Sequence, residues 1–463
     1  METNSIVMKT RSLVLFCAAL LAISAGVSAE NLTVLATFPG DSGPGPKDKP
    51  DNTGGVGPSH VVDFTDARIV VHDKATGKVL QKMDQRDFWK TVQPGFDQPF
   101  FNDPRMLFDA VSGRWICVIA CAIQDASGKR MQEESGYLAV SETFDPTKGW
   151  RGVKLPMKPA DLGMKLGVDK NGVYVTYIVM TGNTHTMHSC IAIPKEDALA
   201  GDGPSLVNLQ TFSDLEIDVF PATDGDPKKP ADAPEILLNR EFGNSFSKLN
   251  LYKITWSGKK ASISKLQNIP LSKTYQSPNG SSLKNQATQP PPGGKLRADE
   301  GRRTLCVFAH GGSLFISNEA KQTVDSRCGI FWAEVRASDG ELLQEALIDD
   351  PNCDYLAPTL AVDSNGNVGL GCARTSATEY PSVYVMMRAA GDLKNTMGPP
   401  VLAAKGTACY SAADPGKYGI GWGNYSATCI DPSDPAKIWT YQEYATSGIP
   451  DEYNTCWAAF KLK

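Results

Sequence analysis

The chain has 463 residues, of which 41% are hydrophobic and 21% are charged, and its formal net charge is −5. This composition is typical of a folded globular protein and excludes a largely disordered chain. The length fits one large domain or two ordinary ones, and the slight acidic excess gives no broad basic surface for nucleic acid. The 42 glycines and 31 prolines favour many turns over long helices.

The first 29 residues have the pattern of a secretory signal peptide. Lys9 and Arg11 precede the apolar run SLVLFCAALLAISAGV, and Val27-Ser28-Ala29 supplies the small residues of a cleavage site. The apolar run is short for a membrane span, and no later stretch approaches that length. We therefore expect residues 1–29 to be removed, and the remaining chain to be secreted, periplasmic or on the cell surface, without a membrane span.

Ten of the eleven cysteines follow the predicted cleavage site. Because an exported chain folds in an oxidising compartment, this even number predicts disulfide bonds, mainly in the C-terminal part. Buried free thiols on strands are the alternative. Three of the ten precede residue 200 and seven follow residue 300, so complete pairing would join the two halves and disfavours two independent domains.

Short β-rich runs separated by Asn-Gly and Asp-Gly turns continue along the rest of the chain. Arg114–Ala122 follows the turn Asp109–Gly113, and Val173–Met180 follows Lys170–Gly172. No helical pattern alternates with these runs, which argues against a parallel α/β sheet and favours a sandwich, a barrel or a propeller. The length is too great for one sandwich, so we expect residues 30–463 to form a single all-β domain, a β-propeller.

Seven blades fit the length best, and six are the alternative. The similar segments Leu166–Gly172 and Leu360–Gly366 predict equivalent hairpins in two different blades. We expect the N-terminal strand near Leu32–Ala36 to close the ring by pairing with Ile438–Tyr444 or Ala458–Leu462, since closure protects strand edges.

Several motifs occur in the order found in a group of exported, mostly uncharacterised bacterial propeller-like proteins. Pro50–Val61 resembles their P-D-x-x-G-x-V-G-P-x-H opening, Asn102–Trp115 resembles a D-P…R-W segment, and Trp422–Ser426 resembles a W-G-D-Y-S motif. The resemblance extends from about residue 50 to the C-terminus and implies a propeller and export, but no known reaction. This chain departs from the pattern at Asn424, where the group has Asp, and at Cys372, where it has Tyr.

Propellers bind ligands at the mouth of the central channel with residues from several blades, so polar and aromatic residues in the turn-rich motifs are candidates. Carboxylates accept hydrogen bonds from sugar hydroxyls, and aromatic rings stack on sugar faces. We therefore expect a carbohydrate or a surface partner as ligand, with turn formation as the alternative role of each Asp. The expected ligand-binding residues are Asp51, His60, Gln289, Asp299, Glu379, Trp422, Asn424 and Tyr425.

The residues leave open whether the protein is an enzyme. Tyr441 and Glu443 are two apart on a strand-like run and share one face. Together with Asp103 and Arg105 they are the weak candidates for catalysis by a glycoside hydrolase or lyase. An adhesive or structural scaffold is the third alternative. The motifs of zincins, α/β-hydrolases, P-loop enzymes and dinucleotide oxidoreductases do not occur.

No metal-binding set is expected from the motifs. There is no CxxC pair, and in the run His185–Cys190 only His188 and Cys190 share a strand face, so surface histidines explain it. Asp363–Asn367 lacks the spacing and the final Glu of an EF-hand loop. Ca²⁺ at an acidic loop stays open, with no position assigned. We expect a monomer whose partner is a carbohydrate or an extracellular protein.

Overall fold

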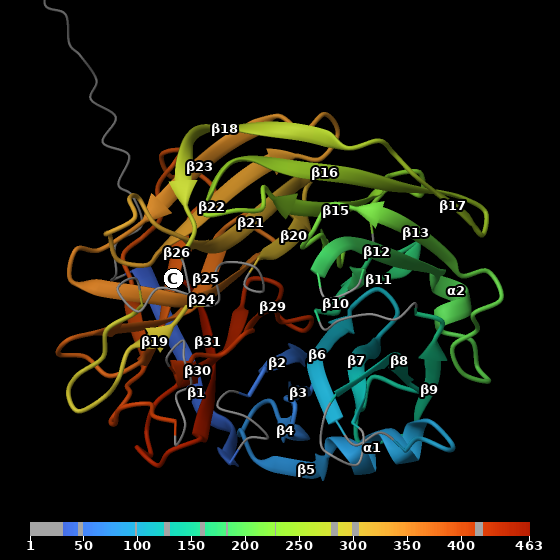
Figure 1. Cartoon of the computed structure of the whole chain (residues 1–463), viewed down its shortest axis with the longest axis horizontal. Helices are drawn as coiled ribbons and strands as arrows, with labels where there is room; N and C mark the ends of the chain where they lie inside the picture. Colours follow the sequence, from blue (N-terminus) through green and yellow to red (C-terminus); the bar gives the residue numbers. More distant parts are fainter. Residues whose placement is uncertain are drawn as a thin grey trace, which may run out of the picture.

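Seven antiparallel sheets are arranged around a central axis in this computed structural model (Figure 1). The structure describes residues 31–463, except for 45–49, 98–99, 125–129, 158–162, 182–183, 227, 279–285, 299–304 and 413–419. The predicted signal peptide therefore lies outside the described residues. The all-β class and the preferred prediction of seven blades are confirmed.

Each blade has four strands, numbered here from the innermost outward. Blade 1 contains β2 (Thr53–Val56), β3 (His60–Phe64), β4 (Arg68–Asp73) and β5 (Val79–Asp84). Blade 2 contains β6 (Phe100–Asp109), β7 (Arg114–Gln124), β8 (Arg130–Ser141) and β9 (Trp150–Leu155). Blade 3 contains β10 (Lys165–Val168), β11 (Gly172–Thr181), β12 (Thr184–Pro194) and β13 (Gln210–Leu215).

Blade 4 has a fifth strand, and comprises β14 (Phe220–Pro221), β15 (Glu235–Arg240), β16 (Ser245–Ser257), β17 (Lys260–Ile263) and β18 (Gln267–Gln276). Blade 5 contains β20 (Cys306–His310), β21 (Ser313–Ala320), β22 (Gly329–Arg336) and β23 (Leu342–Ile348). Blade 6 contains β24 (Cys353–Val362), β25 (Val368–Ser376), β26 (Ser382–Arg388) and β27 (Val401–Ala404). Outside the blades lie the helices α1 (Gln85–Val92) and α2 (Lys195–Ala198), and the parallel pair β19 (Leu296–Arg297) and β28 (Ile420–Gly421).

Blade 7 combines both ends of the chain. Its inner strands are β29 (Ala427–Ile430), β30 (Ile438–Tyr444) and β31 (Glu452–Leu462), and its outermost strand is β1 (Leu32–Pro44). β1 pairs with β31 from Leu32 opposite Leu462 to Pro44 opposite Glu452. The prediction that an N-terminal strand closes the ring is thus confirmed, with the Ala458–Leu462 segment as its partner.

The core lies between neighbouring blades, and the two-residue period of the strands builds it. On β7, the side chains of Trp115, Cys117 and Ile119 pack against blade 1. The intervening Ile116 and Val118 pack against blade 3. A strand buried on both faces needs apolar residues at successive positions. This requirement explains the continuous apolar run Trp115–Ala122 in the sequence.

The antiparallel strands give the ring two distinct faces. We define the top face as the end at which the innermost strands begin, and the bottom face as the end at which they turn into the second strands. The similar segments Leu166–Gly172 and Leu360–Gly366 are both bottom-face turns, in blades 3 and 6. The prediction that they are equivalent hairpins is therefore confirmed.

The predicted disulfide bonds are not found. All ten cysteines after the predicted cleavage site are described, and each is a free thiol. Most lie on strands with their side chains in the cores between blades, as Cys117 and Cys121 do beside Trp115. In these positions cysteine acts as a small apolar residue, which was the alternative interpretation. Among the described residues, no helix is long and apolar enough to cross a membrane.

Candidate ligand-binding site in the central channel

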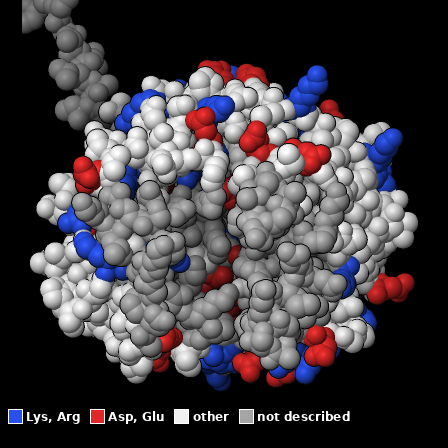
Figure 2. Space-filling model, viewed as in Figure 1, with Lys and Arg blue, Asp and Glu red and all other residues white. Residues whose placement is uncertain are grey.

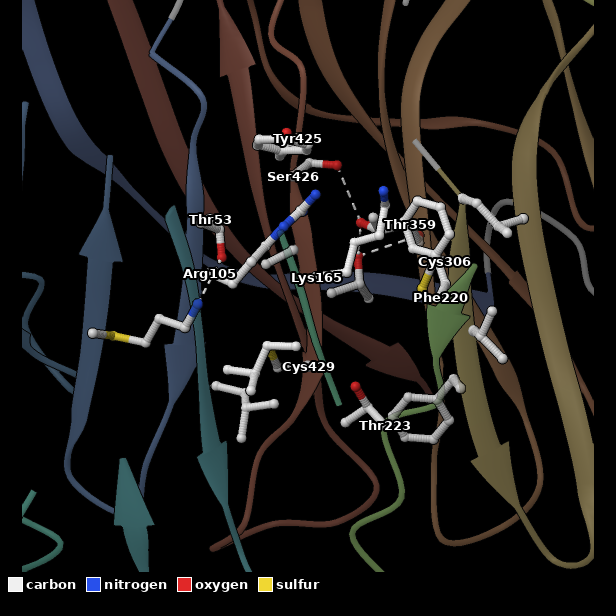
Figure 3. Close-up of a pocket in the computed structure, with 18 of the residues that line it drawn as sticks. Thr53, Arg105, Lys165, Phe220, Thr223, Cys306, Thr359, Tyr425, Ser426 and Cys429 are labelled. Atoms are coloured by element: carbon white, nitrogen blue, oxygen red, sulfur yellow. Dashed lines mark hydrogen bonds between the residues drawn. The ribbon is translucent and has the colours of Figure 1, made fainter. Parts of the chain in front are cut away.

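The innermost strands of all seven blades line a cavity of about 150 Å³ in the central channel (Figure 3). A cavity of this size, about 150 Å³, holds one benzene-sized ring in other proteins. Its wall combines two cations, several hydroxyl groups and apolar side chains. The labelled residues in Figure 3 are Thr53, Arg105, Lys165, Phe220, Thr223, Cys306, Thr359, Tyr425, Ser426 and Cys429.

Arg105 on β6 extends toward Tyr425 and Ser426 at one end of the cavity (Figure 3). Its guanidinium carbon lies 3.4 Å from the centre of the Tyr425 ring, a cation–π contact. The Nε atom donates a hydrogen bond to the carbonyl oxygen of Met164 at 3.0 Å. The Nη2 atom is buried and has no acceptor in the described part of the chain. Arg105 is therefore held in place with one donor group unused.

Tyr425 and Asp103 join the connections of three blades. The Tyr425 hydroxyl donates to Asp103 Oδ1, and the backbone N–H of Gly163 donates to Asp103 Oδ2 at 2.6 Å. Asp103 is fully buried and has a φ of 51°, a left-handed conformation that is uncommon for a residue other than glycine. These bonds fix the tyrosine ring on which Arg105 stacks.

Lys165, at the start of β10, is the second cation of the cavity wall. Its Nζ donates to the carbonyl oxygen of Gly163 at 3.0 Å and lies 3.6 Å from Asp218 Oδ1. The same ammonium group lies 4.6 Å from the centre of the Phe220 ring. Lys165 is thus already balanced by a carboxylate, whereas Arg105 has no ion pair among the described residues.

Hydroxyl groups form much of the remaining polar surface of the cavity. Thr359 Oγ1 lies 2.8 Å from Thr428 Oγ1, and Ser426 donates to the carbonyl oxygen of Ala357 at 2.6 Å. Two thiols also line the cavity. Burial raises the pKa of Cys306 to about 11 and that of Cys429 to about 12, so both stay protonated near neutral pH and are poor nucleophiles.

A second group of polar residues lies at the top face, and we call Asp51, Asn52, Asn424 and Glu443 the top-face cluster. Asn424 Nδ2 donates to Asp51 Oδ1, and the backbone N–H of Gly423 donates to Glu443 Oε2 at 2.7 Å. All four side chains are buried. Figure 2 shows a hollow near the centre of the ring, with acidic side chains visible inside it.

Two other predicted ligand-binding residues are buried and support loops. Gln289 donates to the carbonyl oxygens of Gly294 and Tyr410, at 3.0 and 2.7 Å, and accepts a bond from the Tyr410 N–H. The Trp422 ring meets the Tyr410 ring edge-on at 5.1 Å. Neither Trp422 nor Tyr425 has more than 2% of its surface exposed, so neither offers an open ring face for sugar stacking.

His60 and Glu379 lie apart from the top-face cluster. His60 follows the turn between β2 and β3, which places it at the bottom face, 3.8 Å from Asp145. Glu379 lies in the connection between β25 and β26, where it accepts bonds from Arg374 at 2.9 Å and from Tyr384. Asp299 lies outside the described residues.

Tyr441 shares a strand face with Glu443 but lies in the core between blades 7 and 1. Its ring stacks on Trp457 at 4.8 Å, and its hydroxyl accepts a bond from Thr455 Oγ1 at 2.8 Å. The side chain has no exposed surface, and burial raises the pKa of the hydroxyl well above its usual value. A nucleophile must be exposed and activated, so this geometry argues against the catalytic role considered for Tyr441.

Metal ligation by the His/Cys-rich run is not supported. His188 is fully buried, not on the surface as the sequence indicated, and its Nε2 accepts a bond from the backbone N–H of Asp218 at 3.2 Å. Within the described ranges, no three His, Cys, Asp or Glu side chains are grouped so that they could hold a metal ion.

Four residues of the two sites were missed by the sequence analysis: Asn52, Lys165, Thr359 and Ser426. Asn52 and Ser426 each adjoin a predicted residue, and their motifs could have indicated them. Lys165 and Thr359 sit on innermost strands without a recognisable motif, and only the closed ring shows that they face the channel.

The sequence matches no protein-family model, and no curated protein matches it. In structure, the chain is similar to a Penicillium chrysogenum α-L-arabinanase complexed with arabinobiose, with 9% identity, a TM-score of 0.34, and 66% of this chain and 94% of that chain covered. It is also similar to a Lactobacillus brevis α-L-arabinofuranosidase (9%, 0.33, 76% and 94%) and to the Dos1 propeller (8%, 0.38, 92% and 94%). At these TM-scores, the likeness says nothing about the ligand of this channel.

Proposed function

We propose that this protein binds the end of a carbohydrate chain in its central channel. The observation that carries the proposal is the buried Nη2 of Arg105, which has no acceptor among the described residues. Leaving such a donor unsatisfied costs roughly 1–3 kcal/mol. A hydroxyl or carboxylate oxygen of a bound sugar would supply the missing acceptor.

The size and lining of the cavity support a sugar. Its volume of about 150 Å³ suits one ring, in keeping with the terminal unit of a chain. Hydroxyl groups of Thr53, Thr359 and Thr428 lie on different blades around this space and can both donate to and accept from sugar hydroxyls. The signal-peptide pattern of residues 1–29 favours a ligand found outside the cytoplasm.

Binding is favoured over hydrolysis by the state of the carboxylates. A glycosidase needs two carboxyl groups that reach one substrate bond. Here Asp51, Asp103 and Glu443 are at most 4% exposed, and each is bonded to a neighbouring segment. They serve the connections between blades in this structure.

A scaffold role is not supported by the surface. The large apolar side chains that are more than half exposed belong to six different blades, so they form no shared patch of the kind that marks a broad protein interface. They are Phe144, Val207, Phe242, Val324, Leu393 and Ile449.

The test is a calorimetric titration of the chain without residues 1–29 against neutral sugars, uronic acids and their oligomers. We expect one class to bind, and at 100 times its dissociation constant it should stabilise the protein by roughly 2.7 kcal/mol. Arg105→Met should weaken binding at least about tenfold, because the charged donor is lost. Arg105→Lys should weaken it less.

Arg151→Met is the matched control, because Arg151 is 57% exposed on β9 and pairs only with Glu142 in the described structure. It should bind as the wild type does. Failure of every sugar to bind, or equal binding by Arg105→Met, would refute the proposal. Product analysis of the same mixtures separates binding from turnover, since a released sugar would show that the protein is an enzyme.

A further inference from the structure

We propose that the top-face cluster, Asp51, Asn52, Asn424 and Glu443, binds a calcium ion. This site is separate from the sugar-binding role of Arg105 and does not depend on it. The cluster brings together three segments of the chain, namely the connection before β2, the connection before β29 and the end of β30. All four side chains carry oxygen atoms, and none carries the nitrogen or sulfur ligands that zinc prefers.

Two of these oxygens face a common point beside Gly423. A Cβ atom at Gly423 would lie 2.5 Å from Glu443 Oε2 and 3.1 Å from Asn52 Oδ1. Glycine therefore leaves open a space that both oxygens border, and any side chain at this position would fill it. The direct bond between Asn424 and Asp51 brings the other two members to the same place.

Asn52 is the independent sign of a ligand. Its side chain has no exposed surface, and neither its Oδ1 nor its Nδ2 has a hydrogen-bond partner among the residues described. Buried amide groups in native proteins are nearly always bonded, because an unsatisfied one is costly. A cation next to Oδ1 supplies the missing interaction for that atom.

The charge of the cluster also points to a cation. Asp51 is 4% exposed, and in the described structure its carboxylate is bonded to Asn424 without an ion pair. Buried carboxylates elsewhere in the ring are paired, as Asp41 is with Arg68 at 2.9 Å and Asp431 with Lys74 at 2.7 Å. A buried carboxylate without a cation is unfavourable unless it is neutralised.

Calcium fits this set better than other ions do. Ca²⁺ takes six to eight oxygen ligands from carboxylates, amide carbonyls, backbone and water in a flexible geometry. Mg²⁺ keeps several waters and demands a regular octahedron, which a buried set with two amides suits poorly. Two carboxylates and two amide oxygens form a partial shell that backbone carbonyls or water would complete.

The test starts from the chain without residues 1–29, stripped with EDTA and titrated with CaCl₂ or MgCl₂ by calorimetry, with melting temperature as a second readout. We expect one Ca²⁺ per chain, a raised melting temperature and much weaker binding of Mg²⁺. Glu443→Gln and Asn52→Leu should each weaken Ca²⁺ binding at least about tenfold, because each removes a ligand or its charge.

Asp339→Asn is the matched control, because Asp339 is an exposed carboxylate on blade 5 and should leave Ca²⁺ binding unchanged. Melting in EDTA shows whether each variant folds like the wild type without the ion. Absence of Ca²⁺ binding by the wild type overturns the proposal even if a variant fails to fold. Unchanged affinity in a folded Glu443→Gln or Asn52→Leu, or tighter binding of Mg²⁺ than of Ca²⁺, would overturn it as well.

Discussion

Single lysine–aspartate pairs join neighbouring blades at the bottom face. In each pair, a buried aspartate in the turn after an innermost strand meets a lysine from the next blade at 2.6–3.0 Å. The pairs are Asp109 with Lys195, Asp169 with Lys229 and Asp431 with Lys74. Because each aspartate also shapes its own turn, these residues couple the local hairpin to the packing of the ring.

Asp431→Asn should destabilise the protein and flatten its response to acid. Burial alone would raise the pKa of Asp431, but hydrogen bonds from Lys74, Ser433 and Trp439 outweigh it and hold the pKa well below its usual range. Such a group adds stability above the pKa of about 4 that it has in the unfolded chain. That stability is lost as the pH falls through the folded-state value. We expect a loss of about 3 kcal/mol at pH 7, measured by urea unfolding, and a smaller loss as the pH is lowered below 4.

Asp434→Asn is the control for this change, since Asp434 is 38% exposed on its side chain and lies 3.6 Å from Lys437. Its loss should stay below about 0.5 kcal/mol, as for other surface pairs. Equal losses in the two variants, or a loss in Asp431→Asn that is independent of pH, would contradict the role given to Asp431.

At the residue scale, the sequence located much of the top-face chemistry but not its topology. Asp51, Asp103, Asn424 and Tyr425 were predicted from turn-rich motifs, and the structure joins Asp51 to Asn424 and Asp103 to Tyr425. His60 was predicted with them because it shares a motif with Asp51. It lies at the other face because β2 crosses the ring between the two, and a motif does not say at which end of a strand each residue stands.

At the scale of elements, turn signals predicted the strands well because each blade consists of local hairpins. The Asp-x-Asn-Gly turns after β10 and β24 and the apolar run of β7 follow from local physics. Blade 4 shows the limit of this reasoning. Its innermost strand, Phe220–Pro221, is too short to give a pattern, and the fifth strand β18 adds to the same sheet.

Deletion of residues 31–44 should open the ring. It removes β1, exposes the edge of β31 and removes Asp41, which binds Arg68 of blade 1 at 2.9 Å. We expect the melting temperature to fall by about 10 °C or more and the protein to aggregate through the free edge. Scanning calorimetry and size-exclusion chromatography measure the two effects.

A peptide of residues 31–44 added in trans should restore part of the lost stability, because strand addition to an open edge is a common binding mode. The chain that begins at residue 30 is the reference. If the truncated chain melted at the same temperature as this reference and stayed monomeric, closure by β1 would not be what holds the ring.

At the scale of the whole molecule, packing between blades takes the place that disulfides were expected to fill. The parity of ten cysteines in an exported chain indicated bridges, but parity carries no geometry. The structure instead puts apolar contacts, the lysine–aspartate pairs and the β1–β31 pairing at the joints of the ring. Strand alternation explains why the inference failed, since it turns Cys117 and Cys121 into a core between blades.

The ring should therefore not depend on oxidation. A reducing agent should leave the melting temperature unchanged, whereas loss of a native disulfide typically costs about 2–5 kcal/mol and would lower it by several degrees. The unfolded chain without residues 1–29 should show ten reactive thiols per molecule without prior reduction. In the folded protein most should react slowly, because burial raises the pKa of thiols such as Cys372 and Cys456 to about 12 and the thiolate is the reactive form. Fewer than ten thiols in the unfolded chain, together with a melting temperature that falls on reduction, would mean that exported molecules carry bridges and that the blades move to form them.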